Sequence, residues 1–76
     1  MKLRYAVYDT WRGEYLRELL LMRTDTGGSE VVGMEGTRRA AEGMRFPGVK
    51  SARQVIGKLG GGAEYVVINA KGDIVG

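Results

Sequence analysis

Apolar and polar residues alternate over residues 2–9, near the start of the chain. Leu3, Tyr5 and Val7 occupy alternate positions, and the other positions are held by Lys2, Arg4, Ala6 and Tyr8. Because successive side chains of a strand point to opposite faces, this period of two predicts a β-strand. The stretch that follows, "TWRGE", predicts a turn in which Gly13 adopts a positive φ.

Residues 14–23 fit two different patterns. Apolar residues recur at every fourth position from Trp11 to Leu19, which favours a helix. That helix would contain Gly13, at a cost of about 1 kcal/mol. The stretch "TDTGGSE" has the composition of a hairpin loop leading to the apolar run "VVGM". We therefore expect a strand here, with the helix as the alternative, and a three-stranded meander over residues 2–34.

The clearest helical pattern covers residues 51–59. Four residues at helical spacing form a single apolar stripe: Ala52, Val55, Ile56 and Leu59. Ser51 is a good N-cap residue, and Gln54 three positions later completes a capping box. Gly60 stands where a left-handed residue commonly ends a helix. The sequence predicts a short helix lying on a sheet.

The remaining segments are shorter. Residues 36–43 predict one helical turn at most, and Pro47 with its following glycine predicts a bend. Residues 64–68, "EYVVI", are apolar on both faces, which predicts a central strand. The stretch "NAKGD" predicts a turn into a last short strand, Ile74–Val75. The expected fold is a single α+β domain over residues 1–76. It consists of a small antiparallel sheet, formed by an N-terminal meander and a C-terminal hairpin, with one principal helix packed on one face.

Composition narrows the class of protein. The 76 residues include neither Cys nor His, so a disulfide scaffold is excluded and the commonest general base and metal ligand are missing. A hydrophobic content of 43% favours a folded domain over disorder. The longest apolar run, Leu19 to Met22, is far shorter than the roughly 20 residues that span a bilayer. With charged residues throughout the N-terminal stretch, we expect no secretion signal, no membrane association and a cytoplasmic location.

The stretch "GMRFPGVKSARQ" is a near match to the phosphate-binding loop G-x-x-x-x-G-K-[ST]. Gly43 and Gly48 have the required spacing, but Val49 displaces Lys50 by one position. Ser51 is better explained as a helix cap than as a magnesium ligand. The glycines of "LGGGAE" follow a helix and precede a strand, the reverse of the order found in nucleotide sites. We therefore expect no nucleotide and no other cofactor.

Other routes to catalysis are equally weak. The nine acidic residues are scattered, without the spacing of a metal-binding loop, and are expected to be solvated surface charges. Tyr5 and Tyr8 have opposite parity, so they do not form a stacking platform on one face of a strand. The sequence predicts no catalytic residue and no metal site, and an enzyme is not expected.

Charge is unevenly distributed along the chain. Residues 37–58 include six basic residues and one acidic residue, a net charge of +5, whereas the rest of the chain carries six basic and eight acidic residues. The six candidates for binding an anion or a partner are Arg38, Arg39, Arg45, Lys50, Arg53 and Lys58. A solvated helix face explains such a run without any partner. An acidic protein surface or a nucleic acid is the functional alternative.

The order of motifs resembles that of small proteins borne by phages and conjugative elements of gut bacteria. The resemblance covers "YAVYDTWRGEYL" and, after the Gly-rich loop, "AAEGMRFPGVKSARQVIGKLGGGAEYVVINAKGDIV". In such proteins a hairpin ends in G-E-Y-L, an A-x-R-F segment leads into a helix of the S-A-x-x-V-I type, and a closing strand follows. The resemblance implies the α+β fold already predicted, and it implies no activity and no site residue.

The sequence thus predicts a small non-enzymatic interaction module that binds a protein partner. The alternative is a nucleic-acid-binding accessory protein that uses the basic segment over residues 37–58. The identity of the partner and the oligomeric state stay open. An exposed edge strand at either end of the sheet would allow pairing with a second copy.

Overall fold

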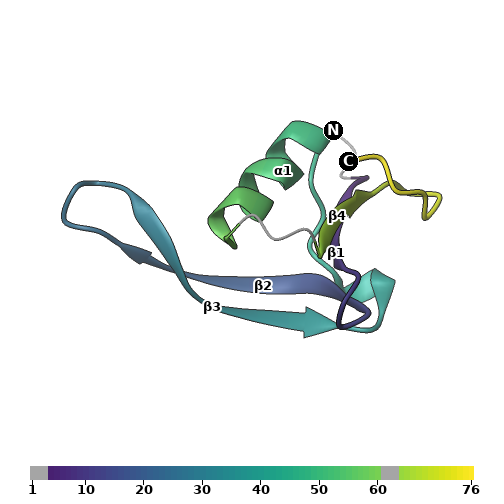
Figure 1. Cartoon of the computed structure of the whole chain (residues 1–76), viewed down its shortest axis with the longest axis horizontal. Coiled ribbons are helices and arrows are strands. Elements are labelled where there is room, and N and C mark those ends of the chain that lie inside the picture. Colours follow the sequence, from purple (N-terminus) through teal and green to yellow (C-terminus); the bar gives the residue numbers. More distant parts are fainter. Residues whose placement is uncertain (1–3, 61–63) are drawn as a thin grey trace.

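The computed structural model describes residues 4–60 and 64–76, and it has the predicted α+β architecture. In chain order the elements are β1 (Ala6–Asp9), β2 (Glu14–Arg23), β3 (Ser29–Thr37), the 3-10 turn η1 (Ala40–Glu42), α1 (Val49–Lys58) and β4 (Tyr65–Ile68). The strands form one antiparallel sheet in the order β3-β2-β1-β4. The helix α1 covers one face of this sheet (Figure 1).

The N-terminal meander is confirmed, and with it the strand rather than the helix after Gly13. Gly13 has the predicted positive φ, +69°, and its N–H donates to the carbonyl of Asp9 at 2.8 Å. Two residues of β1, Tyr8 and Asp9, have register partners on β2. Beyond them the two strands diverge, and the segment leading to α1 fills the opening. The N–H of Met44 there donates to the carbonyl of Leu16 at 2.7 Å, and residue 46 forms an antiparallel bridge with residue 5.

The hairpin of β2 and β3 is the longest element of the molecule. Its register runs from Tyr15 opposite Thr37 to Arg23 opposite Ser29 at the tip. Shifts in this register leave Arg17 on β2 and Val32 on β3 without a register partner, so each is the extra residue of a bulge. The outer part of the hairpin extends past the body of the molecule, beyond the end of α1 (Figure 1).

The apolar character of residues 64–68 predicted a central strand, and this prediction is wrong. β4 is the last strand of the order β3-β2-β1-β4. Its burial has another cause, because the C-terminal segment lies along its outer edge. The N–H of Val67 donates to the carbonyl of Gly76 at 2.9 Å, and the N–H of Val75 donates to the carbonyl of Val67 at 2.8 Å. The predicted last strand is present as a single bridge between Ile74 and Ile68.

The turn before that segment has the predicted chemistry. The side-chain oxygen of Asn69 accepts hydrogen bonds from the N–H groups of Lys71 and Asp73, at 2.9 and 3.0 Å. Gly72 has a φ of +87°. An Asn that accepts from backbone groups two and four positions later, together with a left-handed Gly, closes the turn without strain.

The predicted capping box at Ser51 is wrong. The helix begins two residues earlier, at Val49, with Gly48 as its N-cap and no side-chain cap. The hydroxyl of Ser51 instead donates to the carbonyl of Gly48 at 3.3 Å. Val49 packs against the core and so extends the apolar stripe by one residue toward the N-terminus. Burial of this side chain outweighs the local capping signal. The other end is as predicted, since Gly60 follows the helix with a φ of +100°.

The core is small and lies between α1 and the sheet. Its buried members are Val7, Leu16, Phe46, Ala52 and Val67. The rest of the predicted helix stripe, Val55, Ile56 and Leu59, is half-buried and packs against this cluster. Ala52 is completely buried, and its small side chain lets the helix approach β1 and β4 closely.

Candidate interaction surfaces

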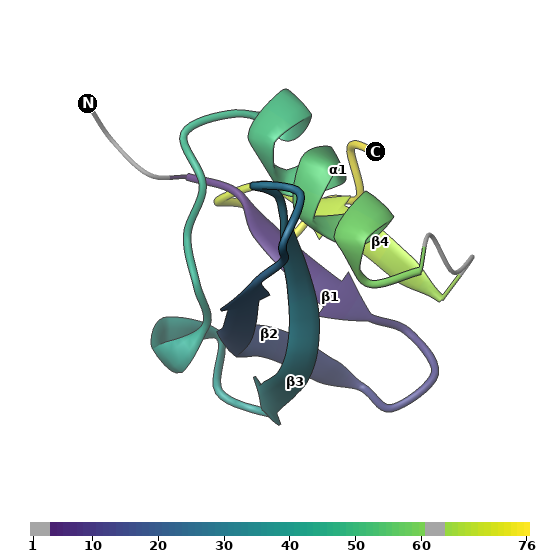
Figure 2. The same ribbon diagram turned by 90° about the vertical axis from the view of Figure 1, so that its left-hand side faces the viewer.

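The six basic residues singled out from the sequence lie in two groups in space. Arg38, Arg39 and Arg45 flank η1, whereas Lys50, Arg53 and Lys58 belong to α1. An extended segment over residues 43–48 separates the two elements, and both views of the ribbon show them apart (Figures 1 and 2). The charge that is continuous along the sequence is therefore divided between two places on the surface.

The group around η1 is partly neutralised by nearby acids. Arg39 forms an ion pair with Glu42 at 3.5 Å, and the same carboxylate is 3.7 Å from the guanidinium of Arg17 on β2. Arg45 donates to the carbonyl of Ala40 at 2.8 Å, which fixes its side chain against η1. Ion pairs this exposed contribute little stability. They do lower the local positive potential and make this group the weaker candidate for an anion site.

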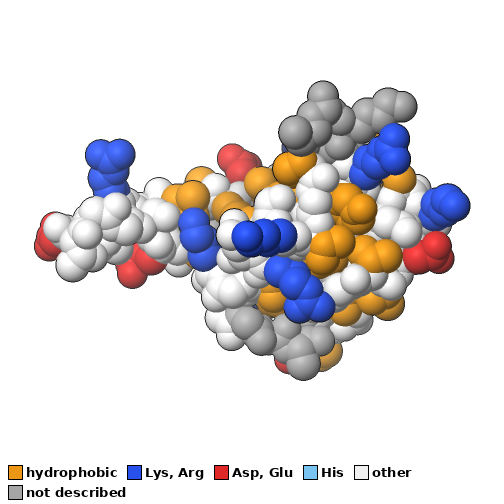
Figure 3. Space-filling view, turned by 90° about the horizontal axis from the view of Figure 1, so that it is seen from above, with side chains coloured by type: hydrophobic (Ala, Val, Ile, Leu, Met, Phe, Trp, Pro, Cys, Tyr) orange, Lys and Arg blue, Asp and Glu red, His pale blue; other side chains and the backbone are white. Residues whose placement is uncertain are grey.

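The group on α1 is free of such pairing. Lys50, Arg53 and Lys58 are all exposed. Among residues 4–60 and 64–76, no carboxylate lies within ion-pair distance of these three side chains. Figure 3 looks onto this face of the molecule and shows Lys and Arg side chains interspersed with hydrophobic and uncharged ones. α1 therefore presents three cations to solvent.

Asp9 differs from the other acidic residues, because the structure buries it. Its residue exposure is 6%, against the solvated position expected from the sequence. One carboxylate oxygen accepts hydrogen bonds from the N–H groups of Trp11 and Arg12, at 2.9 and 3.0 Å. The other oxygen is 3.9 Å from the Arg12 guanidinium. Asp9 thus holds the turn between β1 and β2. An Asp four residues before a turn glycine was the available signal for this role.

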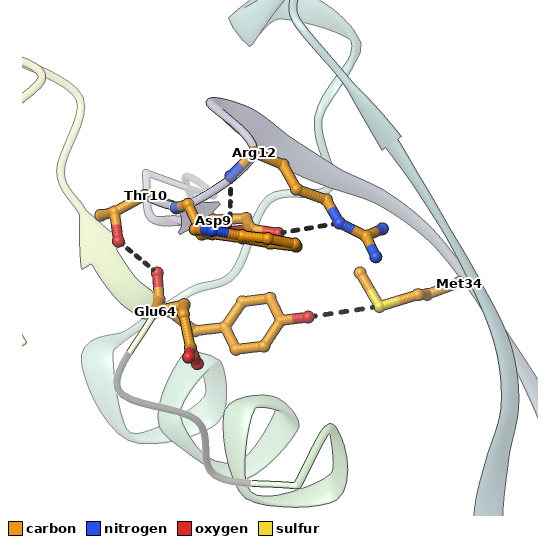
Figure 4. Close-up of polar contacts among 7 residues, drawn as sticks. Asp9, Thr10, Arg12, Met34 and Glu64 are labelled. Atoms are coloured by element: carbon orange, nitrogen blue, oxygen red, sulfur yellow. Dashed lines mark hydrogen bonds and ion pairs between the residues drawn. The ribbon is translucent and has the colours of Figure 1, made fainter.

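The surroundings of Asp9 leave no room for a ligand. Arg12 extends from the turn toward Met34 on β3, and Thr10 donates to the carbonyl of Glu64 at 2.8 Å (Figure 4). The enclosed space beside Asp9 is about 20 Å³. A site for a small molecule occupies about 300 Å³ or more, whereas this space admits one water molecule. The arrangement is suited to holding a turn and not to binding a substrate.

Metal-binding chemistry is equally unsupported by the arrangement of acids. Within the described ranges, no three His, Cys, Asp or Glu residues gather closely enough to hold a metal ion.

The outer part of the β2–β3 hairpin exposes several large apolar side chains. We call residues 20–32 the arm. Four large apolar side chains of the arm are more than half exposed: Leu20 at 57%, Leu21 at 51%, Met22 at 56% and Val32 at 51%. Adjacent residues of a strand point to opposite faces, so the successive leucines and methionine place apolar side chains on both faces of the arm. Sequence reasoning missed this surface, although the unbroken run over residues 19–22 was a signal for it.

A second exposed apolar group lies at the turn between β1 and β2. The ring of Trp11 is 77% exposed, and the guanidinium of Arg12 lies 5.7 Å from its centroid. This cation–π contact covers part of one side of the indole. Trp and Arg are typical of interaction surfaces, but here they form one isolated pair rather than a continuous surface.

Comparison of the chain with protein-family models, with curated proteins and with solved structures found no match.

Proposed function

We propose that this protein is a small non-enzymatic interaction module that binds a protein partner through the arm. The observation that carries the proposal is the exposure of Leu20, Leu21, Met22 and Val32 on a hairpin that extends away from the core. Leu20 and Met22 lie two positions apart on one face of β2, and neighbouring exposed apolar side chains of this kind are typical of a surface that another molecule covers. The arm contributes little to the core, so its apolar side chains are better explained by contacts with a partner.

The composition of the arm supports this interpretation. Four consecutive apolar residues occupy β2 from Leu19 to Met22, and Leu19 alone among them packs against the core. Polar residues at alternate positions would have sufficed for an exposed strand. A surface with few charges and large flexible side chains such as Met and Leu is typical of the centre of a protein interface.

Capture from a lysate of the source organism tests the proposal. The full wild-type chain is one bait, and the chain with Leu20→Thr and Met22→Thr is the arm variant. Threonine keeps the β propensity of both positions. Ile74→Thr is the matched control, because Ile74 is 64% exposed and lies at the opposite edge of the sheet. We expect the arm variant to lose the captured protein and the control to retain it. If both variants capture the same proteins as the wild type, the arm is not the binding surface.

Nucleic-acid binding is the second candidate. It is favoured by the three cations of α1, which have no ion-pair partner among residues 4–60 and 64–76. Three phosphate contacts predict a log–log salt dependence with a slope of about −2.7 on duplex DNA. The variant with Lys50→Gln, Arg53→Gln and Lys58→Gln should abolish that dependence, whereas Arg38→Gln with Arg39→Gln should leave it nearly unchanged. A duplex that shows no binding to the wild type at about 50 mM salt, where such contacts are strongest, would rule out this function.

The proposal includes a cytoplasmic location and an origin in a phage or conjugative element, which rest on the sequence and on the resemblance described above. In the part of the chain that the structure describes, no helix has the length and apolar character needed to cross a membrane.

A further inference from the structure

The two edges of the sheet differ in how they are covered. The outer edge of β4 is occupied by the chain itself, through the hydrogen bonds between Val67 and the C-terminal segment. The outer edge of β3 has no such cover. Across residues 4–60 and 64–76, no hydrogen bond joins the backbone of β3 to a residue outside β2. One edge is closed, and one edge of nine residues is open.

We infer that the partner of the arm is a second copy of this chain, and that the two copies pair antiparallel along β3 to form a continuous eight-stranded sheet. This inference rests on the proposed function, because it names the partner of the same hairpin and places the contact along its outer edge. Unpaired strand edges are commonly protected by Lys, Pro or bulges. β3 contains neither Lys nor Pro, and its protection is limited to Glu30, Glu35 and the bulge at Val32.

The sequence of β3 is compatible with pairing to itself. Full overlap of Ser29–Thr37 with the same strand of a second copy places residue 33 on the two-fold axis. The facing pairs are then Gly33 with Gly33, Val32 with Met34, Val31 with Glu35, and Glu30 with Gly36. No acid faces an acid in this register. A shift of one residue in one direction brings Glu30 opposite Glu35, which like-charge repulsion disfavours. A shift in the other direction pairs no acids but shortens the overlap, so the full overlap combines the longest pairing with the absence of facing acids.

The side chain of Leu20 completes the contact at the axis. It lies over Gly33, so that a Cβ built on this glycine would be 3.1 Å from a methyl group of Leu20. A two-fold axis perpendicular to an antiparallel sheet places the same face of both copies on the same side. The two Leu20 side chains then flank the pair of glycines and cover their backbone. This arrangement gives one of the exposed arm residues a defined neighbour.

The exposed area is larger than that of a compact monomer. The chain exposes 5343 Å², whereas a compact monomer of 8.3 kDa exposes about 4,600 Å². The excess of about 700 Å² reflects the extended hairpin, whose outer part projects beyond the body of the molecule (Figure 1).

The single open edge also limits the size of the assembly. Pairing of β3 with β3 uses the same surface on both copies, so it is isologous and closes as a dimer. Beyond β4 the sheet is bounded by the short C-terminal segment, whose pairing is limited to a bridge and two hydrogen bonds with residues 67–68, so it offers few backbone groups for further growth. A heterologous strand from another protein would satisfy the same backbone groups, and it is the alternative that the experiment must distinguish.

Sedimentation velocity of the full chain between about 1 and 500 µM tests the inference. We expect a mass twice that of the 8.3 kDa chain. Val32→Lys and Val32→Glu should each weaken the dimer at least about tenfold, because like charges meet beside the axis. An equimolar mixture of the two variants should restore the dimer, since the introduced Lys and Glu then lie diagonally across the axis on the same face, within reach of each other. Val75→Lys, on the opposite edge and 42% exposed in the wild type, is the matched control and should leave the mass unchanged.

Several outcomes overturn the inference. The first is a wild-type chain that stays monomeric throughout this concentration range. The second is a dimer that neither Val32 variant weakens, because the interface then lies elsewhere. A third is a dimer weakened by both variants that their mixture does not restore. A monomeric chain whose capture from lysate still depends on Leu20 and Met22 refutes the second copy and leaves the proposed function standing. If neither mass nor capture depends on the arm, both proposals fail.

Discussion

Replacement of Asp9 by alanine should destabilise the fold more than any change at the other carboxylates. The carboxylate is almost fully buried and accepts two backbone N–H groups at 2.9 and 3.0 Å. Hydrogen bonds to a charged acceptor contribute about 1.5 kcal/mol each at the lower end of their range, which applies here because water can reach the turn after the change. The ion pair with Arg12 adds little, since the Arg12 side chain is 59% exposed. The expected loss is about 3 kcal/mol.

This loss is large for a chain of 76 residues, whose total free energy of unfolding is about 4–11 kcal/mol. Asp9→Asn separates the two contributions of the side chain. It keeps an oxygen that accepts both N–H groups and removes the charge, so the expected loss is about 1 kcal/mol. Asp73→Ala is the control, because the Asp73 side chain is exposed and should change stability by less than about 0.5 kcal/mol.

Urea denaturation followed by circular dichroism measures these differences, and thermal unfolding should show a midpoint lowered by more than about 10 °C in Asp9→Ala. Two results would refute the reasoning. An Asp9→Ala variant as stable as the Asp73→Ala control would show that the carboxylate does not hold the turn. Equal losses in Asp9→Ala and Asp9→Asn would show that the charge, and not the pair of accepted hydrogen bonds, is responsible.

Three further changes test the packing and the backbone, each by urea denaturation. Gly57→Ala should raise the free energy of unfolding by about 0.8–1.0 kcal/mol, because this helical glycine has open space around its Cβ position; a loss would mean that the helix is not formed there. Gly72→Ala should lower it by about 1 kcal/mol although space is equally open, because φ is +87°; no change would contradict the left-handed turn. Val67→Ala should cost about 2 kcal/mol through loss of a fully buried side chain, and the half-buried Val66→Ala less than half of that; equal costs would contradict the assigned faces of β4.

Local signals predicted the turns and the fold class well. Gly13, Gly60 and Gly72 all have positive φ at turns or at the helix end where the sequence placed them. These signals depend on a few adjacent residues, so they can be recognised without knowledge of the rest of the structure. The capping box failed for the opposite reason. Ser51 and Gln54 match a local motif, but burial of Val49, a contact with residues distant in sequence, moved the start of the helix.

The position of β4 shows what an apolar strand does and does not indicate. Apolar side chains on both faces report that a strand is covered, and β4 is indeed flanked by β1 and by the C-terminal segment. They do not report what provides the cover. A bridge at Ile74 and two hydrogen bonds to Val67 were enough to enclose an edge, and such short contacts leave little pattern in the sequence.

The basic segment illustrates the difference between charge along the chain and charge in space. All six candidates lie within residues 37–58, yet the extended residues between η1 and α1 carry the two groups apart. Arg39 forms an ion pair with Glu42 of η1, and the carboxylate of Glu42 also lies near Arg17 on β2. Net charge over a window of sequence therefore overestimated the size of any single basic surface. The three cations of α1 are the part of the prediction that still describes one surface.

The existence of the arm could have been predicted from the lengths of the expected helix and strands. A helix of ten residues is about 15 Å long, whereas a strand of ten residues is about 33 Å long. One such helix can cover roughly half of the hairpin in whichever direction it lies. The unbroken apolar run at residues 19–22 lies in the outer half of that strand. A helix placed over the inner half leaves this run uncovered. The overhang follows from these lengths, but its occupant does not, because a second copy and a foreign strand would satisfy the same backbone groups of β3. The second copy is favoured because the full overlap of β3 with itself brings no acid opposite an acid, and the paired Val32→Lys and Val32→Glu variants test that pairing directly.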